Sequence, residues 1–408
     1  MGNIQQNILI HGKRDTEGFT KTLLPLLFFV MALGVFSACA PDTNLSGSGS
    51  WQASSLTRQH IHALTVDPNK PQILYAGDGD GTIFSSSDAG QHWTKRGRVS
   101  PTSITLAMLT ITSSSKTLYA LTDAGLFAST DTAQTWYIVN TSSSGLPADS
   151  YTTLVFDEQK SMYLGTLHHG VFMSNGNDDT RWKAINSTLP PEIAINELAF
   201  DSTQHRLWAA TSLGIYRSDS AGTTWDSLNN GLPIADGGVT SIQPAASAGG
   251  AAGLVYVGTK HGIFRSMDAG TQWAESGQVL QGVPIQHILV DFRSANASTL
   301  YVGTKFGAFR SDDNGQNWRG IAAGLPQNTS VYAFAIGADK ASQLYIAANN
   351  VYLFPGNSSA INPTRVITLL LILVLFVLLG LIAQRSTKRR RAFLHPTPNI
   401  AESPAKKN

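Results

Sequence analysis

The sequence has little cysteine and little charge. It contains one cysteine in 408 residues, and Asp, Glu, Lys and Arg together make up 14% of the chain. A single cysteine excludes an internal disulfide and a cysteine-based zinc site. The low charged fraction excludes a coiled coil and a charge-driven disordered chain. A net charge of +2 gives no reason to expect nucleic acid as a partner. No cofactor or metal motif is present, and we predict neither group.

One long uncharged run is present near the C-terminal end. Residues 366–383 read VITLLLILVLFVLLGLIA, with no polar stripe on any helical face. At about 1.5 Å per residue this run spans roughly 27 Å, close to the hydrocarbon thickness of a bilayer. We predict a transmembrane helix there, after a linker at 356–365. The basic segment 384–408 that follows is predicted to be cytoplasmic, because Lys and Arg accumulate on that side.

The N-terminal end has the layout of a secretory signal. An apolar run at 23–36 is followed by Ser37, Ala38 and Cys39. Residues 36–39 resemble a bacterial lipobox, in which the cysteine is acylated after cleavage. We predict a lipoprotein-type signal peptide at 1–38, lipidation at Cys39 and a flexible tether at 39–50. The alternative is an uncleaved anchor with an inert cysteine. Either one places the middle of the chain on the extracytoplasmic side of the cell membrane.

Tryptophan recurs at a nearly fixed spacing between these ends. Seven of the eight tryptophans lie 42–48 residues apart, at positions 51, 93, 136, 182, 225, 273 and 318. Such a period predicts a propeller or an array. The text before three of them is nearly the same: SSDAGQHW at 86–93, SMDAGTQW at 266–273 and SDDNGQNW at 311–318. Other copies are degenerate.

This S-x-D-x-G-x-x-W text resembles the Asp-box, or BNR, repeat of the sialidase-like superfamily. The resemblance implies a hairpin turn in which Asp accepts backbone N–H bonds, Gly supplies a positive φ, and Trp packs between neighbouring sheets. It also implies that these residues are structural. The positions concerned are Ser86, Asp88, Gly90, Trp93, Asp131, Trp136, Ser266, Asp268, Gly270, Trp273, Ser311, Asp313, Gly315 and Trp318.

The number of blades follows from counting the repeats. Each unit contains four short predicted strands, and six units end at the tryptophans from 93 to 318. A seventh unit begins near 331 and stops near 354 without a tryptophan strand, whereas the strand at Trp51 has no blade before it. We therefore predict an all-β fold, a seven-bladed propeller over 51–355 that is closed by the N-terminal strand at Trp51.

Function is expected where the blades differ, on the face opposite the Asp boxes. By family geometry this face carries the turns between second and third strands and the starts of the innermost strands. The candidate residues for a ligand or partner are His62, Asp78, Asp80, Asp123, His168, His169, Glu197, Lys260, His261, His287, Lys305 and Phe306. Acids gather on the first two blades, and bases on later blades, which suits a protein partner or a zwitterionic ligand. Neighbouring residues of a strand point to opposite faces, so we predict no joint metal site at His168 and His169.

The resemblance leaves three functions open. The non-catalytic photosystem II assembly factor family has one seven-bladed domain and a lipoprotein-like start, although the C-terminal membrane helix departs from it. We predict a membrane-anchored scaffold or assembly factor that binds a membrane or exported protein. One alternative is a glycoside hydrolase of the sialidase or xyloglucanase type, with Glu197 and either Asp80 or Asp123 as its carboxylate pair. The other is a non-catalytic glycan-binding module.

Overall fold

The computed structural model describes residues 50–354, with short gaps at 57–59, 103–104, 113–115, 175–178, 247–248, 295–296 and 338–342. The predicted signal peptide, Cys39, the predicted transmembrane segment and the basic tail lie outside the described residues. Within the described residues, no helix is long and apolar enough to cross a membrane.

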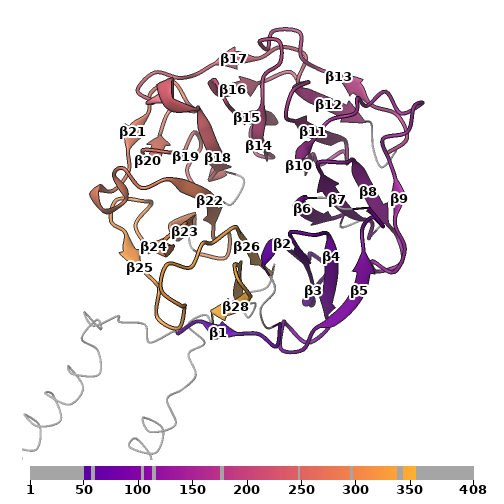
Figure 1. The fold of residues 1–408 in the computed structure, drawn as a ribbon. Coiled ribbons are helices and arrows are strands. Elements are labelled where there is room, and N and C mark those ends of the chain that lie inside the picture. The colour runs from indigo at the N-terminus through magenta and orange to yellow at the C-terminus, as the bar shows by residue number, and fades with distance from the viewer. Residues whose placement is uncertain are drawn as a thin grey trace, which may run out of the picture. The chain divides into compact units, whose positions relative to one another are not determined.

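The described residues form seven antiparallel four-stranded sheets arranged in a ring (Figure 1). The innermost strands, which surround the ring axis, are β2 (Ile61–Asp67), β6 (Leu106–Ile111), β10 (Tyr151–Phe156), β14 (Ile195–Asp201), β18 (Val239–Pro244), β22 (Ile285–Val290) and β26 (Ala333–Ile336). The second strands are β3 (Lys70–Asp78), β7 (Leu118–Thr122), β11 (Met162–Thr166), β15 (Arg206–Thr211), β19 (Val255–Thr259), β23 (Leu300–Thr304) and β27 (Leu344–Ala347).

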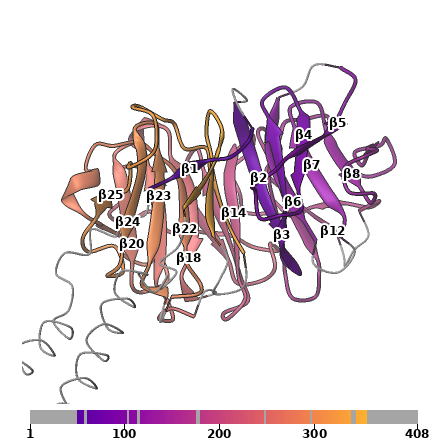
Figure 2. The same ribbon diagram turned by 90° about the horizontal axis from the view of Figure 1, so that it is seen from below.

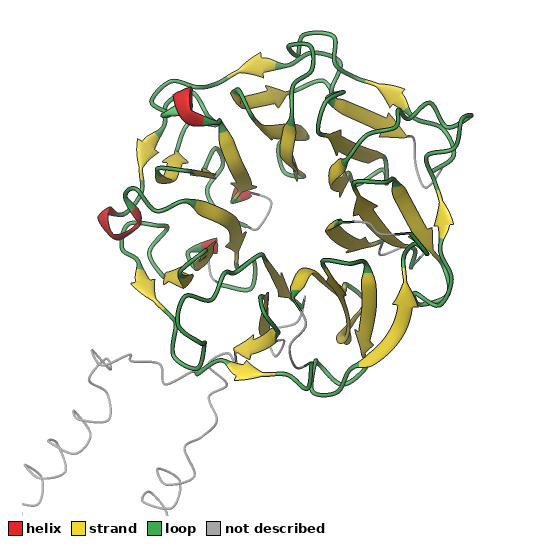
Figure 3. Ribbon diagram, in the orientation of Figure 1, coloured by secondary structure: helices red, strands yellow, loops and turns green. Residues whose placement is uncertain are grey.

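The remaining strands complete each blade toward the rim. The third strands are β4 (Thr82–Ser86), β8 (Leu126–Ser129), β12 (Val171–Ser174), β16 (Gly214–Ser218), β20 (Gly262–Ser266), β24 (Gly307–Ser311) and β28 (Val351–Phe354). The outermost strands are β5 (Thr94–Arg98), β9 (Tyr137–Ile138), β13 (Lys183–Ala184), β17 (Asp226–Ser227), β21 (Ala274–Glu275), β25 (Arg319–Gly320) and β1 (Gln52–Ala53). Two 3-10 helices, η1 (Ile234–Asp236) and η3 (Gln278–Leu280), lie between blades of the described chain (Figure 3). The predicted all-β seven-bladed propeller is therefore confirmed.

Most second strands are buried along their whole length, and the central part of β3 is also buried, because neighbouring blades cover both of their faces. All five residues of β23 are buried, whereas both residues of the outermost strand β25 are exposed. Glycine in these second strands lets the next blade approach closely. A Cβ at Gly258 would lie 2.6 Å from a methyl group of Ile285, and one at Gly303 would lie 2.9 Å from Val331. The stacked blades are seen from the side in Figure 2.

The ring is closed by pairing the two ends of the described chain. Gln52 and Ala53 of β1 pair with Leu353 and Tyr352 of β28. Trp51 is buried beside Phe354, with 4.9 Å between the ring centroids. The strand at Trp51 thus completes the seventh blade, and no blade of the described ring lacks its outer strand.

The three intact Asp-box copies make the same hydrogen bonds. The hydroxyl of Ser86 donates to Asp88 at 2.8 Å, and the hydroxyl of Ser311 donates to Asp313 at 2.8 Å. Each carboxylate then accepts a backbone N–H from four residues further on, at 2.9 Å for both His92 and Asn317. These bonds hold the turn between the third and outermost strands, and we call the side on which these turns lie the Asp-box face.

Degenerate copies keep these bonds with different residues. Ala133 replaces the glycine, adopts a φ of 66° and still donates its N–H to Ser129. Ser220 replaces the aspartate, and its hydroxyl oxygen accepts the Thr224 N–H at 3.0 Å. The turn geometry is therefore retained where the sequence pattern is lost.

Candidate functional site

The ring axis holds a cavity of about 570 Å³ that is lined by the innermost strands of all seven described blades. We call it the channel. The face at which the innermost strands begin is here called the upper face. The Asp-box face lies on the opposite side, because the third strand of each blade runs toward it.

The start of the innermost strands carries a recurring irregularity. In six of the described blades the register with the second strand shifts just after the first residue, as in a β-bulge. The second and third residues of each such strand form what we call a bulge pair. The bulge pairs are His62–Ala63, Ala107–Met108, Thr152–Thr153, Asn196–Glu197, Thr240–Ser241 and Gln286–His287.

From blade 3 to blade 6 the bulge pairs link each blade to the next. The first member donates to a backbone carbonyl of the following strand in three bonds: Thr152 to Ile195 (2.7 Å), Asn196 to Val239 (2.7 Å) and Thr240 to Ile285 (2.8 Å). The second member accepts a backbone N–H of that strand in three further bonds: Thr153 from Leu198 (3.2 Å), Glu197 from Ile242 (2.9 Å) and Ser241 from Ile288 (3.2 Å). One carboxylate oxygen of Glu197, Oε2, therefore already accepts a structural hydrogen bond from the next blade.

The other oxygen of Glu197 faces His287 across blade 5. Oε1 lies 3.9 Å from His287 Nε2, and the two side chains are 19% and 26% exposed. Burial raises the pKa of Glu197, and His287, Ser241 and the Ile242 N–H offset part of that rise. Glu197 is the one carboxylate among the described residues that line the channel.

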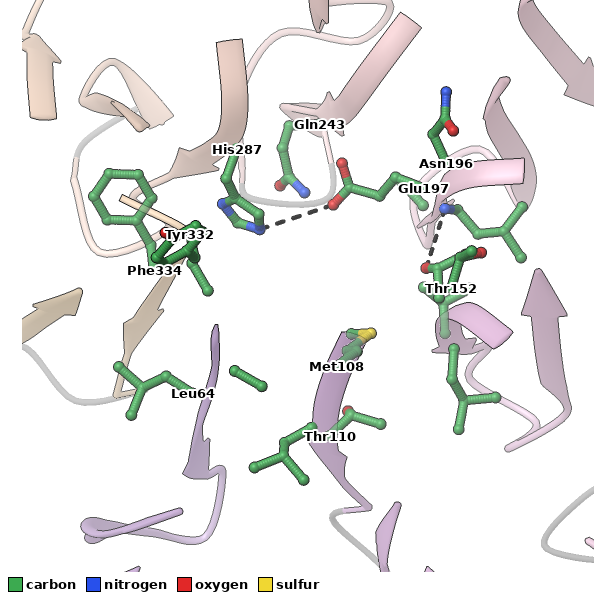
Figure 4. A pocket seen from close by; sticks show the side chains of 18 of the residues that line it. Leu64, Met108, Thr110, Thr152, Asn196, Glu197, Gln243, His287, Tyr332 and Phe334 are labelled. Carbon is green, nitrogen blue, oxygen red and sulfur yellow. Dashed lines mark hydrogen bonds and ion pairs between the residues drawn. The ribbon is translucent and has the colours of Figure 1, made fainter. Parts of the chain in front are cut away.

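The opposite side of the channel is aromatic and apolar (Figure 4). His62 stacks on Tyr332 with 4.6 Å between ring centroids, and Phe334 lies 5.9 Å from His287. Burial lowers the pKa of His62, which favours its neutral form. The structure thus brings together three predicted candidates, His62, Glu197 and His287, around one amphipathic cavity.

The predicted acidic candidates lie outside the channel, in turns of blades 1 and 2. Asp78 accepts the backbone N–H groups of Asp80 and Thr82, and Asp123 accepts that of Thr105. Neither Asp80 nor Asp123 lines the channel with Glu197. The channel therefore does not hold both members of the carboxylate pair that the sequence suggested for a hydrolase.

Several turns of the upper face expose apolar side chains. Leu167, Leu213 and Phe306 occupy turns between second and third strands and are 36%, 48% and 52% exposed. Tyr332, which is 36% exposed, directly precedes the innermost strand of blade 7, β26. Lys305 Nζ lies 4.9 Å from the ring centroid of Phe306. The predicted bases Lys260 and His261 occupy the corresponding turn of blade 5, between β19 and β20.

The expectation that His168 and His169 point apart was wrong. They lie in the turn between β11 and β12, where the strand alternation does not apply, and both rings contact the carboxylate of Asp149. His168 Nδ1 is 2.9 Å from Oδ1, and His169 Nδ1 is 2.8 Å from Oδ2. Asp149 is 2% exposed, whereas the imidazoles are 62% and 51% exposed. Among the described residues, however, no group of three or more His, Cys, Asp or Glu is placed to hold a metal ion.

Sequence reasoning missed Asp149. Burial acts to raise its pKa, but hydrogen bonds from both imidazoles and from the backbone N–H groups of His168 and Ser150 outweigh this and lower the pKa to about 2. A carboxylate just before an innermost strand was the available signal, since the corresponding positions Ile193 and Val283 of other blades are apolar.

Comparison with known sequences relates part of the chain to other propellers. Residues 37–169 match the family model for the DUF6242 beta propeller domain. A probable oligoxyloglucan-reducing end-specific xyloglucanase of Neosartorya fischeri is 30% identical over 214 residues, which is 48% of this chain and 26% of that protein. The corresponding enzyme of Emericella nidulans is 25% identical over 244 residues, or 55% of this chain and 29% of that protein. The chain thus spans little more than a quarter of the length of these relatives.

Solved structures share the fold at low sequence identity. YCF48 from Cyanidioschyzon merolae superimposes with a TM-score of 0.58 at 14% identity, over 76% of this chain and 99% of that one. A structure described as YCF48 bound to D1 peptide gives 0.57 at 16% identity, over 77% and 96%. An ancestral GH74 enzyme gives 0.59 at 16% identity, over 76% of this chain but 46% of its own. At this identity the likeness establishes the propeller fold alone.

Proposed function

We propose that this protein is a membrane-anchored extracytoplasmic propeller that binds a segment of an exported or membrane protein on its upper face, without catalysis. The observation that carries the proposal is the exposure of Leu167, Leu213, Phe306 and Tyr332 on that face. Single exposed apolar residues are ordinary, but a group on the non-repeating face of a propeller favours a docking surface. The neighbouring Lys260 and Lys305 add positive charge that would orient an acidic partner segment.

The structural likeness to YCF48 supports a protein partner. That likeness covers nearly the whole of YCF48, and one of its structures is described as holding a D1 peptide. A one-domain propeller can therefore serve as a peptide-binding module. The D1 peptide itself belongs to that protein, and the client proposed here is defined only by its chemistry.

The glycoside hydrolase alternative has one observation in its favour, the 30% identity to a xyloglucanase over 214 residues. The residues that line the channel argue against this alternative. Glycoside hydrolysis ordinarily requires two carboxyl groups about 5 to 10 Å apart. Glu197 is the one carboxylate that lines the channel in the described part of the chain. Protein binding is therefore the better supported function.

The proposed membrane anchors would orient the propeller relative to the bilayer. β1 begins and β28 ends on the Asp-box face, so the chain enters and leaves the ring on that side. A lipid at Cys39 and a helix at 366–383 would hold the Asp-box face toward the bilayer. The upper face would then point away from the bilayer, where exported proteins are accessible.

The test is an affinity capture of the full-length chain from native membranes in mild detergent, read by mass spectrometry. Wild type is compared with Phe306→Glu and with the triple variant Lys260→Glu, His261→Glu, Lys305→Glu. Met267→Glu is the matched control, because Met267 is 71% exposed on the Asp-box face. We expect one or two proteins to be lost from both upper-face variants and kept by the control. Capture that is equal in all variants, or retention on insoluble polysaccharide without any captured protein, would refute the proposal.

A further inference from the structure

Asp149 joins the two neighbouring histidines of the turn between β11 and β12. Its Oδ1 accepts the Ser150 N–H at 2.7 Å and lies 2.9 Å from His168 Nδ1. Its Oδ2 accepts the His168 N–H at 2.9 Å and lies 2.8 Å from His169 Nδ1. These four contacts use all the acceptor positions of an ionised carboxylate, which has about four. Asp149 is therefore held in place, and its role is to orient the two rings.

The same bonds decide which nitrogen of each imidazole faces outward. An ionised carboxylate can only accept hydrogen bonds, so each Nδ1 carries the proton and donates it to Asp149. The lone pair of a neutral imidazole is then on Nε2, on the far side of the ring. Both imidazoles are more than half exposed, whereas Asp149 is buried. The turn therefore presents the Nε2 acceptors of two neighbouring residues, His168 and His169, at the protein surface.

This arrangement is the one that metal-binding histidines adopt. A histidine that binds a metal through one ring nitrogen ordinarily donates its other N–H to a carboxylate or a carbonyl, which orients the ring and raises its basicity. Here two histidines meet this condition on a single carboxylate. Imidazole nitrogen suits Zn²⁺, Cu²⁺ and Ni²⁺, whereas Mg²⁺ and Ca²⁺ prefer oxygen ligands. The pair thus matches a divalent transition-metal ion.

The surroundings of the pair favour a cation over an anion. His168 and His169 line a cavity of about 770 Å³ together with the exposed side chain of Glu192. When the imidazoles are neutral, the carboxylates of Asp149 and Glu192 leave this region negatively charged. Such a charge attracts a metal ion and disfavours a phosphate or carboxylate ligand. The cavity also leaves room for water around a bound ion.

We propose that His168 and His169 bind a divalent transition-metal ion through their two Nε2 atoms, with Asp149 as the positioning residue. The sequence predicted no joint metal site here, but that prediction assumed strand alternation, which does not apply in this turn. Among the described residues no third His, Cys, Asp or Glu completes a metal-binding group with the pair. Water would fill the other coordination positions, as it fills the open position of catalytic zinc sites. The site does not depend on the proposed protein partner.

The experiment measures Cu²⁺ binding to the full-length chain in detergent by electron paramagnetic resonance and Zn²⁺ binding by isothermal titration. Nitrogen hyperfine coupling counts the imidazoles on Cu²⁺, and we expect two at the tightest site. His168→Ala and His169→Ala should each weaken this site at least tenfold and leave one coordinated nitrogen. Both side chains are more than half exposed, so the ring should stay folded in these variants. Mg²⁺ should not compete.

His92→Ala is the matched control. His92 Nδ1 also contacts a carboxylate, at 2.6 Å from Asp88 Oδ2, but no second histidine adjoins it in the sequence. Its removal should change neither the affinity nor the nitrogen count of the tightest site. Asp149→Asn tests the positioning role and should weaken Cu²⁺ binding roughly ten- to a hundredfold in protein that circular dichroism shows to be folded. A purely structural role would leave the Cu²⁺ affinity of that folded variant unchanged.

Several outcomes would overturn the inference. Equal metal binding by wild type and both histidine variants, or loss of the tightest site in His60→Ala instead, would exclude the pair as ligands. Mg²⁺ binding as tight as Zn²⁺ binding would indicate an oxygen site. Histidine chemical shifts that respond to inorganic phosphate but not to Zn²⁺ would assign the pair to anions. None of these results bears on partner capture through Phe306, so failure of the metal site and failure of the proposed function are distinguishable.

Discussion

The Asp-box turns and the bulge pairs both recur at equivalent positions in successive blades. At the turns the hydrogen bonds repeat, whereas at the bulge pairs the side-chain chemistry changes from blade to blade. At the turns, different residues make the same bonds, as when Ser220 replaces an aspartate and Ala133 replaces a glycine. At the bulge pairs, the same backbone position presents Glu197 in one blade and His287 in another. The repeated backbone therefore builds the ring, and the residues that do not repeat create the chemistry inside it.

The largest loss of stability is expected when a buried tryptophan on the Asp-box side is replaced. Trp273 is 2% exposed between blades, and its indole N–H donates to Leu228 O. Trp273→Ala should lower the free energy of unfolding by about 3–5 kcal/mol, because it leaves a large cavity and removes a buried hydrogen bond. Urea unfolding followed by tryptophan fluorescence measures this loss. Met267→Ala, at an exposed position of the same turn, is the control. If folded Trp273→Ala also fails to capture the partner, the distinction between a structural Asp-box side and a binding upper face is wrong.

Asp149 offers a smaller effect with a defined pH dependence. Its pKa of about 2 lies below the ordinary 3.8, so it stabilises the folded state above about pH 4, and this stabilisation is lost as the pH falls toward 2. Asp149→Asn should therefore cost about 2 kcal/mol at pH 7 and make unfolding less sensitive to acid in this range. Urea midpoints at several pH values test it. Midpoints of the variant that fall with acid as steeply as those of wild type would contradict the assignment.

The sequence was sufficient for the blade count because the repeat is long and its tryptophans are regularly spaced. The closure could also be predicted, since Trp51 had a strand without a blade and the last unit had a blade without its outer strand. The bulges could not be predicted, because a one-residue register shift leaves no mark in the order of the side chains. The contact of Asp149 with His168 and His169 joins two different loops, and spacing along the chain does not reveal such contacts.

The smallest expected change in stability comes from restoring the aspartate of a degenerate Asp-box turn. Ser220→Asp would restore a carboxylate that accepts the Thr224 N–H and bonds to the Ser218 hydroxyl, as in the intact copies. It should raise the free energy of unfolding by about 0.5–1 kcal/mol. The same urea measurement detects this as a higher midpoint with an unchanged slope. Thr223→Asp, one position before the N–H that is bonded, is the control, and an equal gain there would indicate a general charge effect.

The closing strand also determines how the ring would respond to force. Ser50 and Phe354 lie at the same end of the antiparallel pair β1–β28, which is held by the partners Gln52–Leu353 and Ala53–Tyr352. Hydrogen bonds in such a pair run perpendicular to the strands. Tension between the two chain ends would therefore load these bonds one after another, as in opening a zip, rather than all at once in shear. The seam at β1 is thus the point at which a pulled ring would open first, while the other blades stay folded.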